Sequence, residues 1–211
     1  LDAIDQEVHS EITDSKVPVT GILDGISAAI RYELGPVKVN CVVQRGVNEH
    51  QIPKLVRKFR GTGVIVRFIE FMDVGSTNGW TQGQVVPTSE IIHFLSSEFD
   101  LIPLERKSAS DVASRWAHSD GSGEIGFISS VSQPFCGDCV RARLSSDGKF
   151  FTCLFTTNGH DMSALIRSGE KTEILTQSIE EVWSARKDRY SEERPSVAIS
   201  LPRVEMSYIG G

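Results

Sequence analysis

The fold of this chain is decided by one stretch, Val37–Phe71, which reads VKVNCVVQRGVNEHQIPKLVRKFRGTGVIVRFIEF. Val37–Val43 is a β-branched run typical of a strand, and Gly63–Phe71 has the composition of a second buried strand. Asn48–Phe59 between them has the apolar period of a helix, and Pro53 indicates that this helix starts late or is irregular. This strand, helix and strand predict a parallel pair of strands with a covering helix.

The same alternation extends on both sides of this stretch. Gly21–Leu34 has the apolar period of a helix, and Pro87–Phe99 predicts another helix after a loop rich in Gly and Asn. An order of this kind is typical of an α/β fold with a parallel sheet. After about Asp100 the pattern changes to short strands, two helices and an irregular tail. Their predicted bounds are Leu101–Leu104, Ser114–His118, Glu124–Ser130, Met162–Ile166, Thr172–Lys187 and Arg189–Pro202.

Composition excludes several classes of protein. The 211 residues carry a formal net charge of −6, which argues against broad binding of nucleic acid. No apolar run approaches the roughly 18 residues of a membrane span, and no secretory leader is recognisable. The chain opens on Leu1 rather than Met, so we expect it to be a part of a longer protein whose N-terminal segment is missing.

Three of the four cysteines form a pattern with chemical meaning. Cys136 and Cys139 are separated by two residues, and Cys153 follows after thirteen more, whereas Cys41 stands alone in a strand as a small buried apolar residue. The spacing alone leaves three readings open. They are a zinc site with His160 as fourth ligand, an iron–sulfur cluster held by three thiolates, and a redox disulfide within the pair.

A hairpin brings Cys153 back toward the other two cysteines. Its turn signal is Asp147-Gly148, and two registers are open. A two-residue turn pairs Cys153 with Ala142 and sends the hairpin arginines to the other face. A three-residue loop pairs it with Arg141, so that Arg141 and Arg143 share the face of Cys153. A phosphate site beside the cysteines needs the second register.

Two further basic residues interrupt apolar strands. Lys38 and Arg67 are costly to bury unless each is paired or faces a cavity. One interpretation is a structural ion pair, for example of Arg67 with Glu70 or Asp73. The other is a cationic pocket, completed by the hairpin arginines, that contacts the phosphates of an anionic ligand.

Several motifs occur together along the chain. They are RFIEFMDVG at Arg67–Gly75, NGW at Asn78–Trp80, FCGDCVRARLSSDGKFFTCLF at Phe135–Phe155, and YIGG at Tyr208–Gly211. In this combination the chain closely resembles the GTP 3′,8-cyclase family of radical S-adenosylmethionine (SAM) enzymes, which act in molybdenum cofactor biosynthesis. The likeness covers essentially the whole chain.

The resemblance implies a fold and a chemistry. It implies the later βα units of an incomplete TIM-like barrel, residues 1–100, followed by a C-terminal α+β iron–sulfur domain, residues 101–211. Such enzymes carry two 4Fe–4S clusters, and the first, held by a CxxxCxxC loop, generates a radical from SAM that abstracts hydrogen from the ribose C3′ of GTP before C3′ bonds to C8. That loop is absent here. The chain alone is therefore expected to be inactive without the missing N-terminal part of the same protein.

The resemblance also assigns roles to single residues. In this family the second cluster has three cysteine ligands and one iron that is free to bind the purine. The resemblance therefore implies that His160 is not a metal ligand. The implied assignments are Cys136, Cys139 and Cys153 as ligands of this 4Fe–4S cluster, Met72 as a SAM contact, Lys38, Arg141, Ala142 and Arg143 as GTP contacts, and Arg67, Gly210 and Gly211 as catalytic residues.

A rival function belongs to a different class. The same cysteines could stabilise, with zinc or a cluster, a non-catalytic nucleotide-binding module. For the cyclase function the expected partners are GTP, SAM and the missing N-terminal part of the same protein, with no nucleic acid, no membrane and a homodimer as a further possibility. The expected location is the cytoplasm, or an organellar matrix in a eukaryote.

Overall fold

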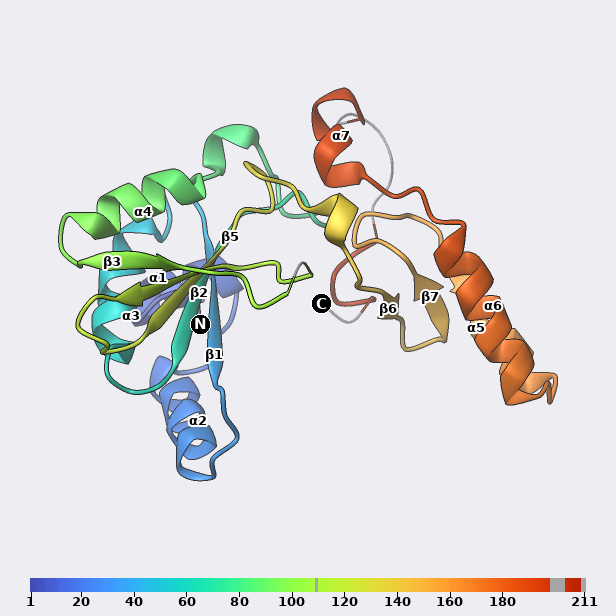
Figure 1. Cartoon of the computed structure of the whole chain (residues 1–211), viewed down its shortest axis with the longest axis horizontal. Helices are drawn as coiled ribbons and strands as arrows, with labels where there is room; N and C mark the ends of the chain where they lie inside the picture. The colour runs from blue at the N-terminus through green and yellow to red at the C-terminus, as the bar shows by residue number, and fades with distance from the viewer. Residues whose placement is uncertain (109, 198–203, 210–211) are drawn as a thin grey trace. The chain divides into compact units, whose positions relative to one another are not determined.

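The structure is a computed structural model that describes residues 1–108, 110–197 and 204–209. The chain divides into two compact units (Figure 1). The first unit comprises Leu1–Met72 and Thr81–Pro134, and the second comprises Asp73–Trp80 and Phe135–Gly211. Each unit is described by itself below.

A five-stranded mixed sheet forms the centre of the first unit, in the order β1-β2-β5-β4-β3. β1, β2 and β5 are parallel to one another, while β4 runs antiparallel to both β5 and β3. The chain thus has a mixed α/β fold, and the predicted parallel pair is confirmed in β1 and β2. The strands are β1 (Lys38–Val43), β2 (Ile65–Glu70), β3 (Leu101–Leu104), β4 (Ser114–His118) and β5 (Glu124–Ile128).

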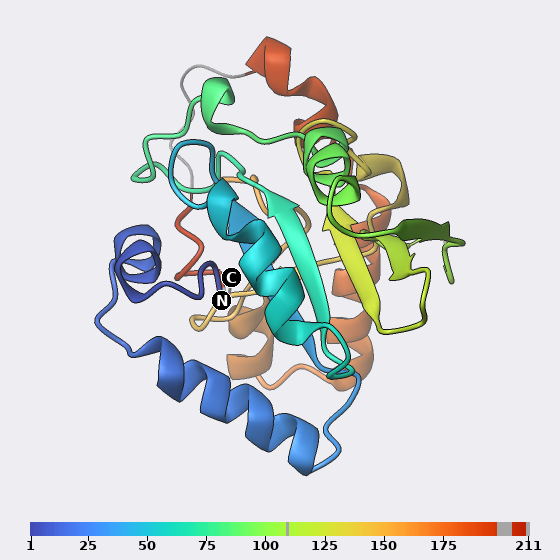
Figure 2. The same cartoon turned by 90° about the vertical axis from the view of Figure 1, so that its left-hand side faces the viewer.

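Helices cover one face of this sheet, and Figure 2 shows α3 and α4 in front of the strands. Alternate residues of β1 and β2 are buried on that face, and they pack with Leu55, Val56, Ile91 and Leu95 of the two helices. Pro53 lies in the first turn of α3, where proline is tolerated. The helical segments of this unit are α1 (Gln6–Thr13), α2 (Val19–Arg31), η1 (Glu49–Gln51), α3 (Ile52–Phe59), η2 (Gln82–Gln84) and α4 (Thr88–Ser96).

The opposite face of the sheet is more open. Lys38 and Asn40 are exposed in β1, and Ile65, Arg67 and Ile69 of β2 are only half-buried. The period of two along each strand therefore sends apolar residues to the helices and the basic residues to the open face. This alternation allows a lysine and an arginine to stand in strands that are otherwise apolar.

The second unit contains a small antiparallel sheet of β6, β7 and β8 and three helices. The predicted helices near 162–166 and 172–187 are confirmed as α5 and α6. The prediction of an irregular tail from Arg189 was wrong, because residues 190–197 form α7. Its elements are η3 (Cys136–Asp138), β6 (Arg143–Leu144), β7 (Lys149–Phe151), β8 (His160–Asp161), α5 (Met162–Arg167), α6 (Thr172–Ser184) and α7 (Tyr190–Val197).

The hairpin of β6 and β7 settles the open question of register. Arg143 pairs with Phe151, and the loop consists of residues 146–148. Gly148 ends this loop at φ +85°, a conformation that glycine adopts without steric cost. The loop therefore has the three residues that a phosphate site beside the cysteines needs. The pairing ends at Arg143 and Phe151, and Cys153 lies two residues beyond it.

The predicted division at residue 100 stays a prediction about functional parts. The boundary between the compact units falls after Pro134, because β3, β4 and β5 belong to the same sheet as β1 and β2. Within the described part of the chain, no helix is long and apolar enough to cross a membrane.

Candidate functional site

The three spaced cysteines all lie in the second unit. Cys136 begins the single turn η3, whose backbone closes with a hydrogen bond from Cys139 N to Cys136 O at 3.2 Å. Cys153 lies two residues beyond β7, and its sulfur accepts from Phe155 N at 3.5 Å. All three thiols are free and half-buried, whereas Cys41 is free and fully buried, as expected for a core residue.

The charges around the thiols differ from one sulfur to the next. Burial tends to raise the pKa of Cys139, but hydrogen bonds from the Arg141 backbone and guanidinium outweigh it, and the net pKa is lowered. Burial raises the pKa of Cys153, and the nearby charges of Asp188, Cys136 and Cys139 raise it further. The thiol of Cys139 is therefore easier to ionise than the thiol of Cys153.

The three cysteines can be compared with the requirements of a zinc site and with those of an iron–sulfur cluster. Among the residues that the structure describes, no three metal-binding side chains lie close enough to share one ion. A cluster makes a different demand, because each cysteine sulfur binds its own iron. Cys136 and Cys139 in η3 and Cys153 after β7 supply three free thiols in one unit, which is the number of ligands that the expected cluster requires. His160, the zinc candidate, is exposed in β8.

The hairpin arginines lie beside these cysteines. Arg141 donates from Nη2 to the Cys139 sulfur at 3.7 Å, and its guanidinium lies 5.0 Å from the centre of the Phe135 ring. Arg143 is half-buried, and burial lowers the pKa of its guanidinium together with the charge of Arg141. Ala142 between them is exposed. The second unit thus holds two cations and three thiols on one hairpin and its preceding turn.

Arg67 lies on the open face of the first unit's sheet. Its Nε donates to Asn40 Oδ1 at 2.8 Å, and burial lowers the pKa of its guanidinium. The alternative of an ion pair with Glu70 is wrong, because Glu70 points to the other face and is fully buried. On the other side of Arg67 lies Gly126, where a Cβ would come within 2.9 Å of Arg67 Cγ.

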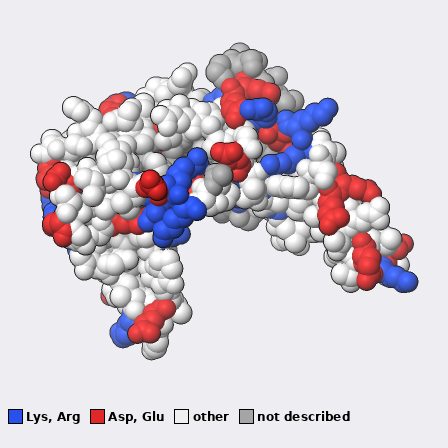
Figure 3. All heavy atoms as spheres, in the orientation of Figure 1, with Lys and Arg blue, Asp and Glu red and all other residues white. Residues whose placement is uncertain are grey.

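Further charges surround this position. Arg115 of β4 and Glu124 of β5 form a two-fold ion pair with both distances at 2.7 Å. Hydrogen bonding to Arg115 lowers the pKa of Glu124, and the charges of Lys107 and Lys38 add to the effect. Figure 3 shows lysine and arginine side chains gathered over the strands of this unit. The open face is therefore locally basic on an acidic protein, as the anion-pocket hypothesis requires.

Glu70 ties together the loops at the carboxyl end of the sheet. Its carboxylate accepts from the backbone N–H of Thr88, Val131 and Ser132 at 2.7–2.8 Å, and from Ser132 Oγ. Active sites of parallel α/β sheets are built on loops at this end. Met72, the predicted SAM contact, follows two residues later and is half-buried. Glu70 thus holds the loop that starts α4 and the loop that leaves β5.

Asp73, the other residue predicted to pair with Arg67, contacts two residues of α7. Within the second unit it accepts from Tyr190 Oη at 2.6 Å and from Arg194 Nε at 3.0 Å, and both Asp73 and Arg194 are buried. Tyr190 and Arg194 are four residues apart, so they lie on one face of α7. This double attachment is the physical reason that residues 190–197 form an ordered helix instead of an irregular tail.

The residues before the terminal glycines are anchored in the second unit. Ile209 is 1% exposed, and Tyr208 donates from its hydroxyl to Asp147 at 2.7 Å while packing edge-on against Phe151. Tyr208 and Ile209 thus anchor the chain just before the terminal glycines. Gly210 and Gly211 themselves lie outside the described residues.

The predicted site residues are divided between the two units. The cysteines and hairpin arginines share the second unit, while Lys38, Arg67 and Met72 belong to the first. Sequence reasoning missed Asn40 and Gly126. Asn40 stands two residues after Lys38, which puts it on the same strand face, and a glycine inside a strand signals close approach of another group.

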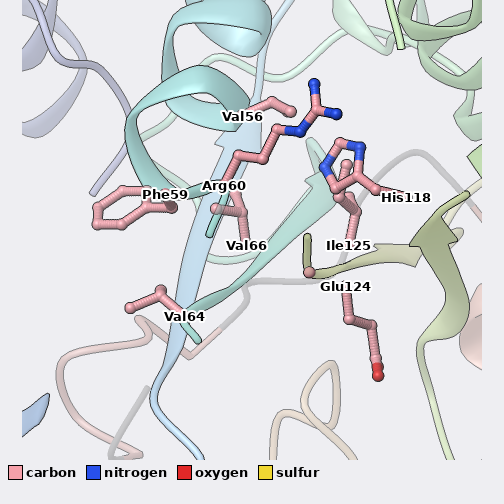
Figure 4. Close-up of a pocket in the computed structure, with 9 residues that line it drawn as sticks. Val56, Phe59, Arg60, Val64, Val66, His118, Glu124 and Ile125 are labelled. Atoms are coloured by element: carbon pink, nitrogen blue, oxygen red, sulfur yellow. The ribbon is translucent and has the colours of Figure 1, made fainter. Parts of the chain in front are cut away.

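A small pocket lies at the other end of the sheet (Figure 4). It is lined by residues that include Phe59, Arg60, His118 and Glu124. His118 is 3% exposed, and its Nδ1 is buried without a hydrogen-bond partner among the described residues. None of the predicted site residues lines this pocket, so we treat it as part of the structural core of the first unit.

The fold and the site together define a mixed α/β protein with three spaced cysteines and two arginines in and around one hairpin. The family model described as Molybdenum Cofactor Synthesis C matches residues 64–192. Over the whole chain, GTP 3′,8-cyclases are 46% identical in Xanthomonas axonopodis pv. citri, 43% in Staphylococcus carnosus and 40% in Acidothermus cellulolyticus. The chain belongs to this molybdenum cofactor synthesis family. It spans 63–65% of the length of these three relatives.

Proposed function

We propose that this chain is the C-terminal part of a GTP 3′,8-cyclase. The complete enzyme would convert GTP to (8S)-3′,8-cyclo-7,8-dihydroguanosine 5′-triphosphate in molybdenum cofactor biosynthesis. The observation that carries the proposal is that one unit holds three free thiols, at Cys136, Cys139 and Cys153, and that the guanidinium of Arg141 donates to the Cys139 sulfur at 3.7 Å. Relatives that bear this enzyme's name align with the chain from end to end.

In this proposal the three cysteines hold a 4Fe–4S cluster. When bound, that cluster supplies an iron without a cysteine ligand, which can bind the purine. The protein's own contribution would be to supply the three thiols and to place a cation beside one of them. Arg141 contacts the Cys139 sulfur directly and carries a charge that favours its thiolate.

Each unit contains residues that are candidates for contacts to GTP. Arg141 and Arg143 present guanidinium groups, which suit bidentate contacts to phosphate oxygens, with Ala142 as the exposed backbone position between them. Lys38 and Arg67 stand on the basic open face of the sheet, and Asn40 fixes the orientation of Arg67. Met72, at the carboxyl end of β2, would contact SAM in the longer protein.

The finer parts of the fold and setting belong to the same proposal. The sheet of β1, β2 and β5 would be the later part of an incomplete TIM-like radical SAM barrel, and the missing N-terminal part would supply a second 4Fe–4S cluster. Without that part the chain would be inactive. Gly210 and Gly211 would follow the Tyr208 anchor toward the substrate. A homodimer, and a cytoplasmic or organellar location, remain predictions.

Iron loading tests the proposal most directly. Anaerobic reconstitution should load iron and sulfide, and Cys153→Ser should lose the cluster because one of three ligands is removed. Cys41→Ser is the matched control and should keep it, because Cys41 is buried among apolar residues of the other unit. Stoichiometric zinc without iron would instead favour the rival, a non-catalytic nucleotide-binding module stabilised by zinc.

Nucleotide affinity tests the role of the hairpin arginines. In the full-length protein, Arg141→Ala and Arg143→Ala each remove a charge-assisted contact worth about 1.5–3 kcal/mol. Affinity for GTP should then fall roughly ten- to a hundredfold, measured by calorimetry, since 1.4 kcal/mol is tenfold. Guanosine has no phosphates, so its affinity should barely change. Equal weakening of guanosine and GTP would show that the arginines do not bind phosphate.

A further inference from the structure

One short segment of the second unit contacts the chain beside every one of the three cysteines. We call it the bracket and define it as residues 186–194, which comprise the connection between α6 and α7 and the start of α7. Its side chains reach the turn η3 and the strand end at residues 152–155, which are separated from each other along the chain. No motif in the sequence drew attention to it.

The contact beside Cys139 is made by Arg186. Its Nη2 donates to the backbone carbonyl of Cys139, and its guanidinium stacks 3.8 Å from the centre of the Trp183 ring. The stacking fixes the planar group over α6, so that the donor points at the turn. The positive charge of Arg186 also lies within electrostatic range of the Cys139 sulfur.

The contact beside Cys136 is made by Glu192. Its carboxylate accepts from the backbone N–H of Gly137 at 3.3 Å, and its other oxygen accepts from Arg189 Nε at 2.5 Å. The backbone amides of Cys136 and Gly137 both help to lower the pKa of Glu192, after the larger effect of Arg189. The carboxylate therefore satisfies amides that η3, as a single turn, leaves without partners inside the helix.

Two contacts lie beside Cys153. Thr152 Oγ1 donates to Asp188 Oδ2 at 2.6 Å, and the ring of Tyr190 stacks on Phe155 with centres 4.4 Å apart and an angle of 24°. Thr152 is buried and Asp188 is half-buried, so the hydroxyl group is largely protected from water. The residues on both sides of Cys153 are thus held by the bracket.

The bracket has its own firm anchor. Asp73 accepts hydrogen bonds from Tyr190 and Arg194, and the guanidinium of Arg194 lies 5.6–5.9 Å from the ring centres of Trp80, Phe155 and Tyr190. Asp73 and Arg194 are 2% and 6% exposed. A buried ion pair enclosed by aromatic rings gives the segment one defined position against the 73–80 loop.

From these contacts we propose that the bracket positions the three cysteines for the cluster and sets the charge around it. Arg186, Asp188 and Glu192 are the positioning residues, each acting through a backbone or hydroxyl group beside a cysteine. This inference rests on the proposed function, because it assumes that the cysteines hold the cluster. Groups that orient metal ligands typically change metal affinity 10–100-fold when they are removed.

Charge gives the bracket a signature that a structural role lacks. Reduction adds an electron to the cluster, so a nearby negative charge opposes it and a nearby positive charge favours it. Asp188→Asn should raise the reduction potential of the reconstituted chain, and Arg186→Gln should lower it. Glu180→Gln, on the exposed side of α6, is the matched control and should leave it unchanged. Shifts of the same sign in both variants, or none, would overturn the charge role.

A measurement without metal tests positioning separately. In the metal-free 211-residue chain, Glu192→Gln should speed backbone hydrogen exchange at residues 136–139, whereas Glu180→Gln should not. The same variant should load iron but lose it to a chelator roughly tenfold faster than the control. Wild-type exchange and wild-type iron loss would overturn the inference. A wild-type chain that takes up no iron would defeat the proposed function instead, and the exchange experiment would still decide whether the bracket positions the turn.

Discussion

The two units are stabilised in different ways. In the first, β1, β2 and β5 share one large apolar cluster with α3 and α4, and Phe68 and Phe127 stack at its centre. In the described part of the second unit the buried apolar side chains are Phe151, Met162 and Ile209. Polar contacts such as the pair of Asp73 with Arg194 connect its segments.

The difference teaches where the chemistry can be placed. A close-packed apolar core holds one arrangement by itself, so the first unit can present Lys38 and Arg67 on a rigid sheet. The second unit has little apolar surface to bury, as is common in small domains that depend on a metal for stability. We therefore expect a cluster bound by its cysteines to contribute to the folding of the second unit much more than to that of the first.

Truncation of the core should show the largest effect. Leu55 of α3 is fully buried in the first unit, so Leu55→Ala should lower the free energy of unfolding by about 2–5 kcal/mol in urea denaturation. Ile166→Ala in α5 of the second unit removes a side chain that is 64% exposed and should change it by less than about 0.5 kcal/mol. Equal losses would mean that the apolar cluster does not distinguish the units.

The same contrast explains what could be predicted from sequence. Strands and helices of the first unit follow apolar periodicity, because a large core imposes a regular pattern of burial, and β1, β2 and α4 were predicted within a few residues. The spaced cysteines and the two candidate registers of the hairpin were also found from local sequence. The roles of Cys136, Cys139 and Cys153, and those of Arg141 and Arg143, came from the resemblance and stay predictions.

The remaining features depend on contacts between distant residues. α7 was missed because its order comes from Tyr190 and Arg194 binding Asp73, more than a hundred residues away. The choice of hairpin register came from the loop geometry at Gly148, which a turn signal alone leaves open. Gly126 was missed because only the paired strand shows that the Arg67 side chain passes over it.

The tail anchor should show a smaller effect, confined to the second unit. Tyr208→Phe keeps the ring against Phe151 but removes the hydroxyl that donates to Asp147 and accepts from Lys149 Nζ at 3.2 Å. Backbone hydrogen exchange at residues 205–209 should become several-fold faster, while exchange in β1 and β2 stays unchanged. Unchanged exchange in the tail would show that Ile209 alone anchors it.

The smallest expected effect is a pH dependence that belongs to the first unit alone. Burial lowers the pKa of His118 from its ordinary 6.5, and the positive charge of Arg60 lowers it further, against a smaller opposing effect of Asp120. In Figure 4 the Arg60 and His118 side chains lie beside the same pocket. The folded protein thus favours neutral His118, edge-on to the ring of Phe99.

The sign of the effect follows from proton counting. Below pH 6.5 the unfolded chain binds a proton at His118 that the folded chain does not, so the stability from this residue is complete above that pH and decreases as the pH falls. The slope for one proton is at most about 1.4 kcal/mol per pH unit. Urea denaturation at pH 7.5 and 5.5 should therefore give a smaller difference in His118→Phe than in wild type. His160→Gln, in exposed β8 of the second unit, should retain the wild-type difference. If His118→Phe also retains it, carboxylates elsewhere cause the pH dependence, and the buried imidazole does not distinguish the two units.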